Sequence, residues 1–113
     1  MCSQHTLNLI TDQVVKAVRE SLGNKLDRVI LYGSYARGDF NGESDIDIMV
    51  LADIPRESCS DEYEKINRFI SRLGLKYDIL ITVNVTDCTT FNRFIHDLPF
   101  YTNVQREGVV LSV

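Results

Sequence analysis

RVILYGSYARGDFNGESDIDIMVL, residues 28–51, contains two predicted strands with a polar segment between them. The first strand covers residues 28–32, where Val, Ile and Tyr side chains favour extended backbone, and Gly33-Ser34 follows it at once. Residues 38–44 are polar and contain two glycines, so we expect a loop there. Residues 45–51 then form the second strand. The sequence thus predicts two strands separated by Gly33-Ser34 and a polar loop.

The second strand has two chemically different faces. Side chains alternate across a strand, so every second residue shares a face. One face carries Ile46, Ile48 and Val50, and the other carries Asp45, Asp47 and Met49. Two carboxylates in a strand otherwise rich in apolar residues would be costly to bury without cations.

Helices are predicted on both sides of this stretch. Apolar residues at spacings of three and four mark a helix that Gly23-Asn24 closes, and a second helix is capped by Ser58 or Ser60 and ended by Gly74. The first apolar stripe is Leu7, Ile10, Val14, Val18 and Leu22, and the second is Tyr63, Ile66, Phe69, Ile70 and Leu73.

The rest of the chain adds shorter elements. Residues 77–83 form a third strand, residues 89–96 a short helix, Pro99 starts another helix, and residues 109–111 make a last small strand. Alternating helices and strands favour an α/β (α+β) fold with a small mixed sheet flanked by helices. A length of 113 residues fits one domain, residues 1–113.

Composition excludes several classes of protein. The net charge is −4, and Lys and Arg are scattered along the sequence, which disfavours direct nucleic-acid binding. Cys2, Cys59 and Cys88 show no zinc-binding spacing and indicate free thiols in a reducing compartment. No apolar run approaches the length of a membrane span, and no signal peptide is visible. We therefore expect a cytoplasmic protein without a membrane partner.

The carboxylates can be placed relative to one another from the order of the elements. Asp45 and Asp47 have Cα atoms about 6.6 Å apart on one face of a strand, and paired catalytic metal ions lie ~3.5–4 Å apart. One helix connects their strand to the strand of Asp78, so these strands should be parallel neighbours. Asp78 near the start of its strand would then lie at the same end of the sheet.

The Gly33-Ser34 turn reaches that end too if the first two strands are antiparallel. Glycine allows a phosphate to approach the backbone, and Ser34 offers a hydroxyl and a helix N-terminus. Each part alone has a plainer explanation: Gly-Ser is usually a simple turn, and Asp-Ile-Asp can be a solvated edge strand. Together they predict a site for a metal-bound triphosphate.

The two-part motif resembles that of a known family. Gly33-Ser34-Tyr35-Ala36-Arg37-Gly38 followed by Ser44-Asp45-Ile46-Asp47 is similar to the G-S-x-A-R-G…S-D-x-D pattern of the minimal nucleotidyltransferases. These belong to the DNA polymerase β-type nucleotidyltransferase superfamily. The resemblance extends from the first strand through Asp78, and implies the single-domain nucleotidyltransferase fold.

The resemblance also implies roles for individual residues. Gly33 and Ser34 would hold the β- and γ-phosphates of ATP, and Arg37 would complement the triphosphate charge. Asp45 and Asp47 would bridge two Mg²⁺ ions, and Asp78 would be the third acid, which binds the catalytic metal.

Minimal nucleotidyltransferases of this type resemble antitoxins that are encoded beside HEPN-domain toxins. These toxins are small helical ribonucleases. The resemblance implies transfer of AMP to a tyrosine of such a toxin. The chain has no room for an acceptor-binding domain, so a homodimer or another protein must supply that surface.

Two other functions stay open at this point. The acceptor could be a small-molecule hydroxyl such as that of an aminoglycoside, with Glu43, Asp53 or Glu57 as an additional base. Alternatively the chain could neutralise its partner by binding alone. The aromatic anchors for such binding would come from Tyr35, Phe40, Phe100 and Tyr101.

Overall fold

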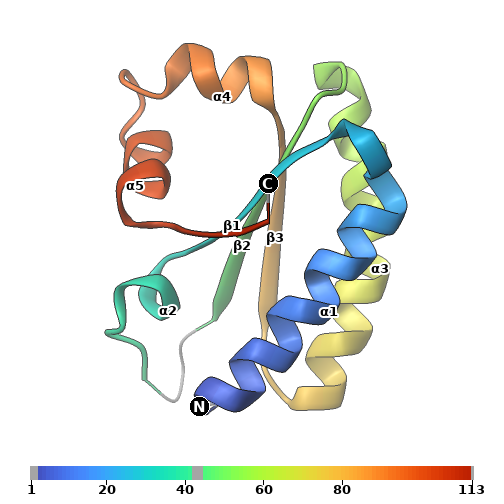
Figure 1. Cartoon of the computed structure of the whole chain (residues 1–113), viewed down its shortest axis with the longest axis vertical. Helices are drawn as coiled ribbons and strands as arrows, with labels where there is room; N and C mark the ends of the chain where they lie inside the picture. Colours follow the sequence, from blue (N-terminus) through green and yellow to red (C-terminus); the bar gives the residue numbers. More distant parts are fainter. Residues whose placement is uncertain (1–2, 42–44, 113) are drawn as a thin grey trace.

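The computed structural model describes residues 3–41 and 45–112. It contains one four-stranded sheet, in the order β3-β2-β1-β4, with helices packed on both faces (Figure 1). The elements in chain order are α1 (Gln4–Leu22), β1 (Leu26–Tyr32), α2 (Ser34–Arg37), β2 (Ile46–Ala52), α3 (Cys59–Tyr77), β3 (Ile81–Asp87), α4 (Cys88–Phe94), α5 (Pro99–Glu107) and β4 (Val109–Ser112). The predicted mixed sheet flanked by helices is confirmed.

The strand directions agree with the sequence-based expectation. β1 and β2 are antiparallel, with Tyr32 opposite Asp47, and β2 and β3 are parallel, with Asp47 opposite Thr82. β4 pairs antiparallel with the other edge of β1. Asp47 is therefore flanked by a residue of β1 on one side and a residue of β3 on the other.

One face of the sheet is covered by α1 and α3, which lie side by side (Figure 1). The predicted stripe of α1 is confirmed, because Leu7, Ile10, Val14, Val18 and Leu22 are all buried. They pack with the apolar face of β2, namely Ile46, Ile48 and Val50, and with Ile66, Ile70 and Leu73 of α3. Tyr63 was expected in the α3 stripe and is instead 40% exposed.

The opposite face is covered in part by α4 and α5. Met49 and Leu51 of β2 pack there with Phe91, Ile95 and Val104. Asp47 has the same alternation as Met49 and Leu51, so it belongs to this face, beyond the apolar cluster, where it is half-buried. The predicted segregation of β2 into an apolar face and a face bearing carboxylate is confirmed.

The expected end of the second long helix and start of the third strand are wrong. α3 continues past Gly74 to Tyr77, and Asp78 has φ 54 and ψ 47 in the left-handed region. The N–H of Ile79 donates to the carbonyl of Gly74 at 3.0 Å, and the N–H of Asp78 donates to that of Leu75 at 3.4 Å. These are the two bonds of a Schellman helix end. β3 therefore starts at Ile81, four residues later than predicted.

Gly74 has a different purpose from the predicted helix stop. A Cβ atom at Gly74 would lie 2.7 Å from the carbonyl oxygen of Ile79, closer than real Cβ contacts allow. The glycine thus leaves room for the turn to fold back against the helix. Gly74 therefore marks a close approach of the backbone one turn before α3 ends, and it does not mark the helix end itself.

Candidate active site

Gly33 packs against the Asp47 carboxylate at the end of the sheet. Gly33 has φ 76, a backbone conformation that side chains rarely adopt, and it directly follows the residue paired with Asp47. A Cβ atom built on Gly33 would collide with Oδ2 of Asp47. Only glycine therefore fits between this carboxylate and the turn, and the sequence-based expectation that the two lie at one end of the sheet is met.

The turn after Gly33 is a single helical turn, α2. The carbonyl of Gly33 accepts hydrogen bonds from the N–H groups of Ala36 and Arg37, both at 3.1 Å. The first N–H groups of a helical turn have no partners inside it and can be directed to an anion. Ser34, the first residue of α2, is half-buried beside the carboxylate end of β2. Gly33 and Ser34 thus start a short helical turn next to the carboxylate of Asp47.

Thr82 contacts Asp47 from the other side. Its Oγ1 donates a hydrogen bond to Oδ1 of Asp47 at 2.6 Å. The two carboxylate oxygens of Asp47 thus have different environments, because Oδ1 faces the β3 hydroxyl and Oδ2 faces Gly33. Sequence reasoning missed Thr82, since the predicted strand 77–83 started four residues too early to give its register.

Asp45 lies immediately before β2 and is half-buried. The N–H of Ile46, the next residue, donates to the carbonyl of Leu80 at 3.0 Å, which joins the start of β2 to the segment entering β3. Asp45 is thereby held two residues from Asp47 at the end of the sheet that also carries Gly33. Ser44 of the motif lies outside the described residues.

Asp78 does not take the position expected for a third acid. It is exposed in the left-handed turn that ends α3, and no part of β3 contains it. Within residues 3–41 and 45–112, no three His, Cys, Asp or Glu side chains lie close enough to hold a metal ion together. In this structure Asp45, Asp47 and Asp78 do not form such a group, and a metal-binding role for Asp78 stays a prediction. The physical reason for the position of Asp78 is the extra turn of α3.

Two carboxylates still fit a magnesium–nucleotide complex. Mg²⁺ prefers oxygen ligands and is commonly held by one or two carboxylates together with substrate phosphates and water. Asp45 and Asp47 supply such oxygens, and Oδ2 of Asp47 faces the turn that starts at Gly33. The donor set thus suits a hard cation that arrives with a triphosphate.

Arg37 lies at the last position of α2 and is largely exposed. Its Nε donates to Asp39 at 3.1 Å and its Nη1 to Glu107 at 3.5 Å. The hydrogen bond and the charge of Asp39 raise the pKa of Arg37, with a further contribution from Glu107. A phosphate ligand would have to compete with these two carboxylates, both of which are accessible to water.

A pocket of about 250 Å³ adjoins the turn on its α5 side. It is lined by Tyr32, Gly33, Arg37, Phe100, Asn103, Val104 and Glu107. Tyr32 meets Phe100 edge to face, with ring centroids 5.6 Å apart. Burial raises the pKa of Tyr32, and the negative charge of Asp47 raises it further. The pocket extends the carboxylate end of the sheet toward α5.

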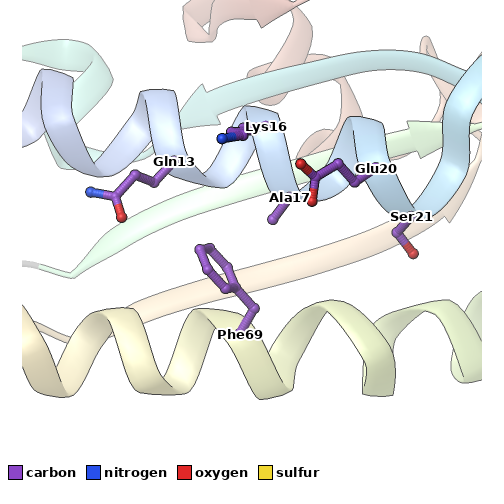
Figure 2. A pocket seen from close by; sticks show the side chains of 6 residues that line it. All are labelled: Gln13, Lys16, Ala17, Glu20, Ser21 and Phe69. Atoms are coloured by element: carbon purple, nitrogen blue, oxygen red, sulfur yellow. The ribbon is translucent and has the colours of Figure 1, made fainter.

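A pocket of about 540 Å³ lies between α1 and α3 and contains none of the predicted site residues. Figure 2 shows Phe69 of α3 directed toward Ala17 of α1, with Gln13, Lys16, Glu20 and Ser21 along the rim. These helices cover the face of the sheet opposite to Asp47. This pocket is therefore separate from the carboxylate and glycine arrangement, in spite of its volume.

Basic side chains gather on α3, although they are scattered in the sequence. The exposed residues at spacings of three and four are Lys65, Arg68, Arg72 and Lys76. Such spacing puts them along one helix face. Lys65 is also ion-paired with Glu62, and this face belongs to the helix layer away from Asp47.

The residues considered as an additional base for a small-molecule acceptor, and as aromatic anchors for binding alone, do not gather at one place. Asp53 and Glu57 are exposed, away from β2's carboxylate end, and Glu43 lies outside the described residues. Tyr35 is buried and stacks on the half-buried Phe40, with centroids 4.4 Å apart, and Tyr101 stacks on the core residue Phe91. Phe100 alone among the four proposed anchors is well exposed, at 45%.

Comparison with known proteins identifies the class of enzyme. A model of the nucleotidyltransferase domain family matches residues 11–110, so the chain belongs to that family. It is 41% identical over 92 residues, 81% of this chain and 91% of the relative, to a Methanocaldococcus jannaschii protein named as a candidate protein adenylyltransferase. A second M. jannaschii protein with such a name is 34% identical over 99 residues, 88% of this chain and 91% of the relative.

Solved structures share the fold at lower identity. A crystal structure described as a candidate nucleotidyltransferase from Sulfolobus solfataricus superposes with a TM-score of 0.62 at 22% identity, covering 96% of this chain and 87% of that one. A Shewanella oneidensis complex of a tri-AMPylated HEPN toxin with its MNT antitoxin superposes with a TM-score of 0.51 at 20% identity, covering 92% of this chain and 70% of that one. A toxin–antitoxin structure with AMP-PNP superposes with a TM-score of 0.55 at 21% identity, covering 89% of this chain and 71% of that one.

Within the described chain, no helix has the length and apolar character that crossing a membrane requires.

Proposed function

We propose that this nucleotidyltransferase transfers AMP from Mg-ATP to a hydroxyl group of another protein. The contact between Gly33 and Oδ2 of Asp47 carries the proposal, because it joins a phosphate-sized turn to a cation-binding carboxylate. The names of the M. jannaschii relatives support a protein as the acceptor.

The residues have separate tasks in this reaction. Asp45 and Asp47 hold magnesium, and Gly33 and Ser34 receive the β- and γ-phosphates at the start of α2. Arg37 adds positive charge beside the triphosphate once it leaves Asp39 and Glu107. Bound magnesium supplies charge stabilisation for the leaving pyrophosphate and acidifies the acceptor hydroxyl.

The chemical balance is that of a single displacement. The acceptor oxygen forms a bond to the α-phosphorus while the bond from this phosphorus to the pyrophosphate oxygen breaks, and the hydroxyl proton is released. The chain's own residues contribute positioning and a preorganised field, rather than covalent chemistry. Asp78, in the turn that ends α3, is given no step in this proposal.

The proposed acceptor is a tyrosine of a HEPN toxin, and the chain would act as its antitoxin. The support is the fold shared with the MNT antitoxin of the tri-AMPylated HEPN toxin complex and with the AMP-PNP complex. Other acceptors, including a small-molecule hydroxyl, would use the same carboxylate and glycine arrangement.

The test combines the purified chain, Mg-ATP and a candidate HEPN-domain protein, and measures the intact mass of the HEPN protein. We expect a mass gain of one adenylyl group, AMP less one water, with the wild-type chain and none with Asp47→Asn. A Ser112→Ala chain is the control for a remote polar substitution, since Ser112 bonds to Arg19 at the far edge of the sheet. An unmodified HEPN protein with the wild-type chain would contradict the proposed acceptor.

Neutralisation by binding alone is separated from catalysis in the same experiment. If Asp47→Asn suppresses the toxin's ribonuclease activity as well as the wild type does, the chain acts by binding. Loss of suppression together with loss of the mass gain supports transfer of AMP.

A further inference from the structure

We propose that Thr82 is a positioning residue that orients Asp47 for the cation. Thr82 lies directly opposite Asp47 in the parallel pairing of β2 and β3, and its hydroxyl donates to Oδ1 at 2.6 Å. Oδ2 is left facing Gly33, where the phosphate-binding turn begins. The inference rests on the proposed function. It assigns the orientation of the Asp47 carboxylate to a neutral side chain.

The need for such a residue follows from the freedom of an aspartate. The torsion that rotates a carboxylate about its last carbon–carbon bond has broad minima, so β2 alone does not fix which oxygen faces the turn. A hydroxyl donor at one oxygen removes that freedom. Threonine suits the purpose because its branched Cβ restricts its own rotation in a strand.

Neighbouring polar groups leave this pair undisturbed. Farther along the same face of β3, the hydroxyl of Thr86 donates to Oδ1 of Asn84 at 2.6 Å. These two side chains are paired with each other, at positions opposite Leu51 and Met49 of β2. On the β1 side, Tyr32 lies opposite Asp47 and packs its ring against Phe100. The Thr82 hydroxyl is therefore free of Thr86 and Asn84 and is bonded to the Asp47 carboxylate.

The identity of the residue has an electrostatic consequence. Thr82 is the residue opposite Asp47 on β3, and its neutral side chain adds no negative charge there. The described part of the site therefore offers Asp45 and Asp47 as its acids, and much of the cation's coordination must come from phosphate oxygens and water. We expect divalent cations to bind much more tightly with a nucleotide than without one.

The test measures Mn²⁺ affinity by electron paramagnetic resonance, with and without a non-hydrolysable ATP analogue. Thr82→Val removes the hydroxyl while keeping the shape and the strand preference, and Thr82→Ser restores the donor. Loss of a hydrogen-bond partner of a metal ligand typically costs 10–100-fold in metal affinity. We expect about a tenfold loss for Thr82→Val and near wild-type affinity for Thr82→Ser. Thr86→Val, which removes a hydroxyl from the same strand face, is the matched control and should leave Mn²⁺ affinity unchanged.

Each outcome has one meaning. A Thr82→Val chain that binds Mn²⁺ like the wild type, while Asp47→Asn does not, overturns the role of Thr82 and keeps the proposed site. A wild-type chain that binds no better than Asp47→Asn overturns both. A lower melting temperature for Thr82→Val with unchanged Mn²⁺ affinity shows a structural residue only and overturns the inference. If Thr82→Val does not fold, Thr82→Ala is compared with Thr82→Ser in the same assay.

Discussion

Gly33 lies against Oδ2 of Asp47, so that the turn after β1 and the carboxylate on β2 form one continuous surface. The contact is possible because β1 and β2 are antiparallel, which returns the end of one strand to the start of the other. The glycine has both a positive φ and no space for a side chain. These two constraints can be separated by substitution.

Gly33→Ala should abolish AMP transfer. The added methyl group collides with the Asp47 carboxylate and also forces an unfavourable φ, so the turn or the carboxylate must move. Gly38→Ala is the control, because Gly38 has φ 83 but nothing within 4 Å of a Cβ atom. It should lose only about 1–2 kcal/mol of stability through backbone strain. Nucleotide binding by calorimetry and thermal unfolding separate the two, and equal nucleotide affinities would contradict the role of the contact.

Asp78→Gly should stabilise the protein and leave Mn²⁺ binding unchanged. Asp78 occupies a left-handed position at the end of α3, where glycine has no steric penalty. The expected gain in the free energy of unfolding is about 1 kcal/mol, measured by urea denaturation. Asp45→Asn is the comparison that should weaken Mn²⁺ binding. A large loss of Mn²⁺ affinity in Asp78→Gly would restore Asp78 as a metal ligand.

Gly74→Ala should destabilise the protein although alanine favours a helix. The helix preference of alanine contributes about 1 kcal/mol, but the new Cβ would lie 2.7 Å from the backbone oxygen of Ile79. Overpacking of this kind typically costs about 1–3 kcal/mol, and the turn that sets the start of β3 would shift. Ser71→Ala, one turn earlier on an exposed position, is the control. Higher melting temperatures for both variants would contradict the close approach.

The thiols of Cys59 and Cys88 should be slow to react at neutral pH. Burial raises the pKa of each thiol, and nearby carboxylates, Asp87 for Cys59 and Asp27 for Cys88, raise it further. A raised pKa keeps the thiol protonated in the folded protein, so reactivity increases as pH rises above the unfolded value of about 8.5. Because the pKa of each thiol is higher in the folded state than in the unfolded state, the free energy of unfolding falls as the pH rises through that range. Disulfide-exchange reagents applied to a Cys2→Ser chain, folded and in denaturant, measure the difference. Equal rates in the two states would contradict it.

Much of the fold could be read from local patterns. The spacing of Leu7, Ile10, Val14, Val18 and Leu22 predicts α1, and alternation in residues 45–51 predicts which face of β2 is apolar. The crossover through one helix predicts the parallel pairing of β2 with β3. These features depend on short-range periodicity and on general rules for connections, so a single sequence suffices.

The candidate site was predicted less completely. Gly33, Ser34, Asp45 and Asp47 belong to one contiguous motif, and the antiparallel pairing brings their segments to the same end of the sheet. Asp78 and Thr82 depend on where α3 stops. That stop is set by a left-handed residue other than glycine and by a close packing of Gly74 on Ile79, and neither gives a strong local signal.

The amino-acid sequence by itself therefore determined the amphipathic elements, the glycine turn and the paired carboxylates, because each of these is encoded by neighbours along the chain. The tertiary structure alone decided that Thr82, rather than Asp78, lies beside Asp47. Four residues of strand register separate the two arrangements, and register is fixed by how the helix end packs and pairs across the sheet.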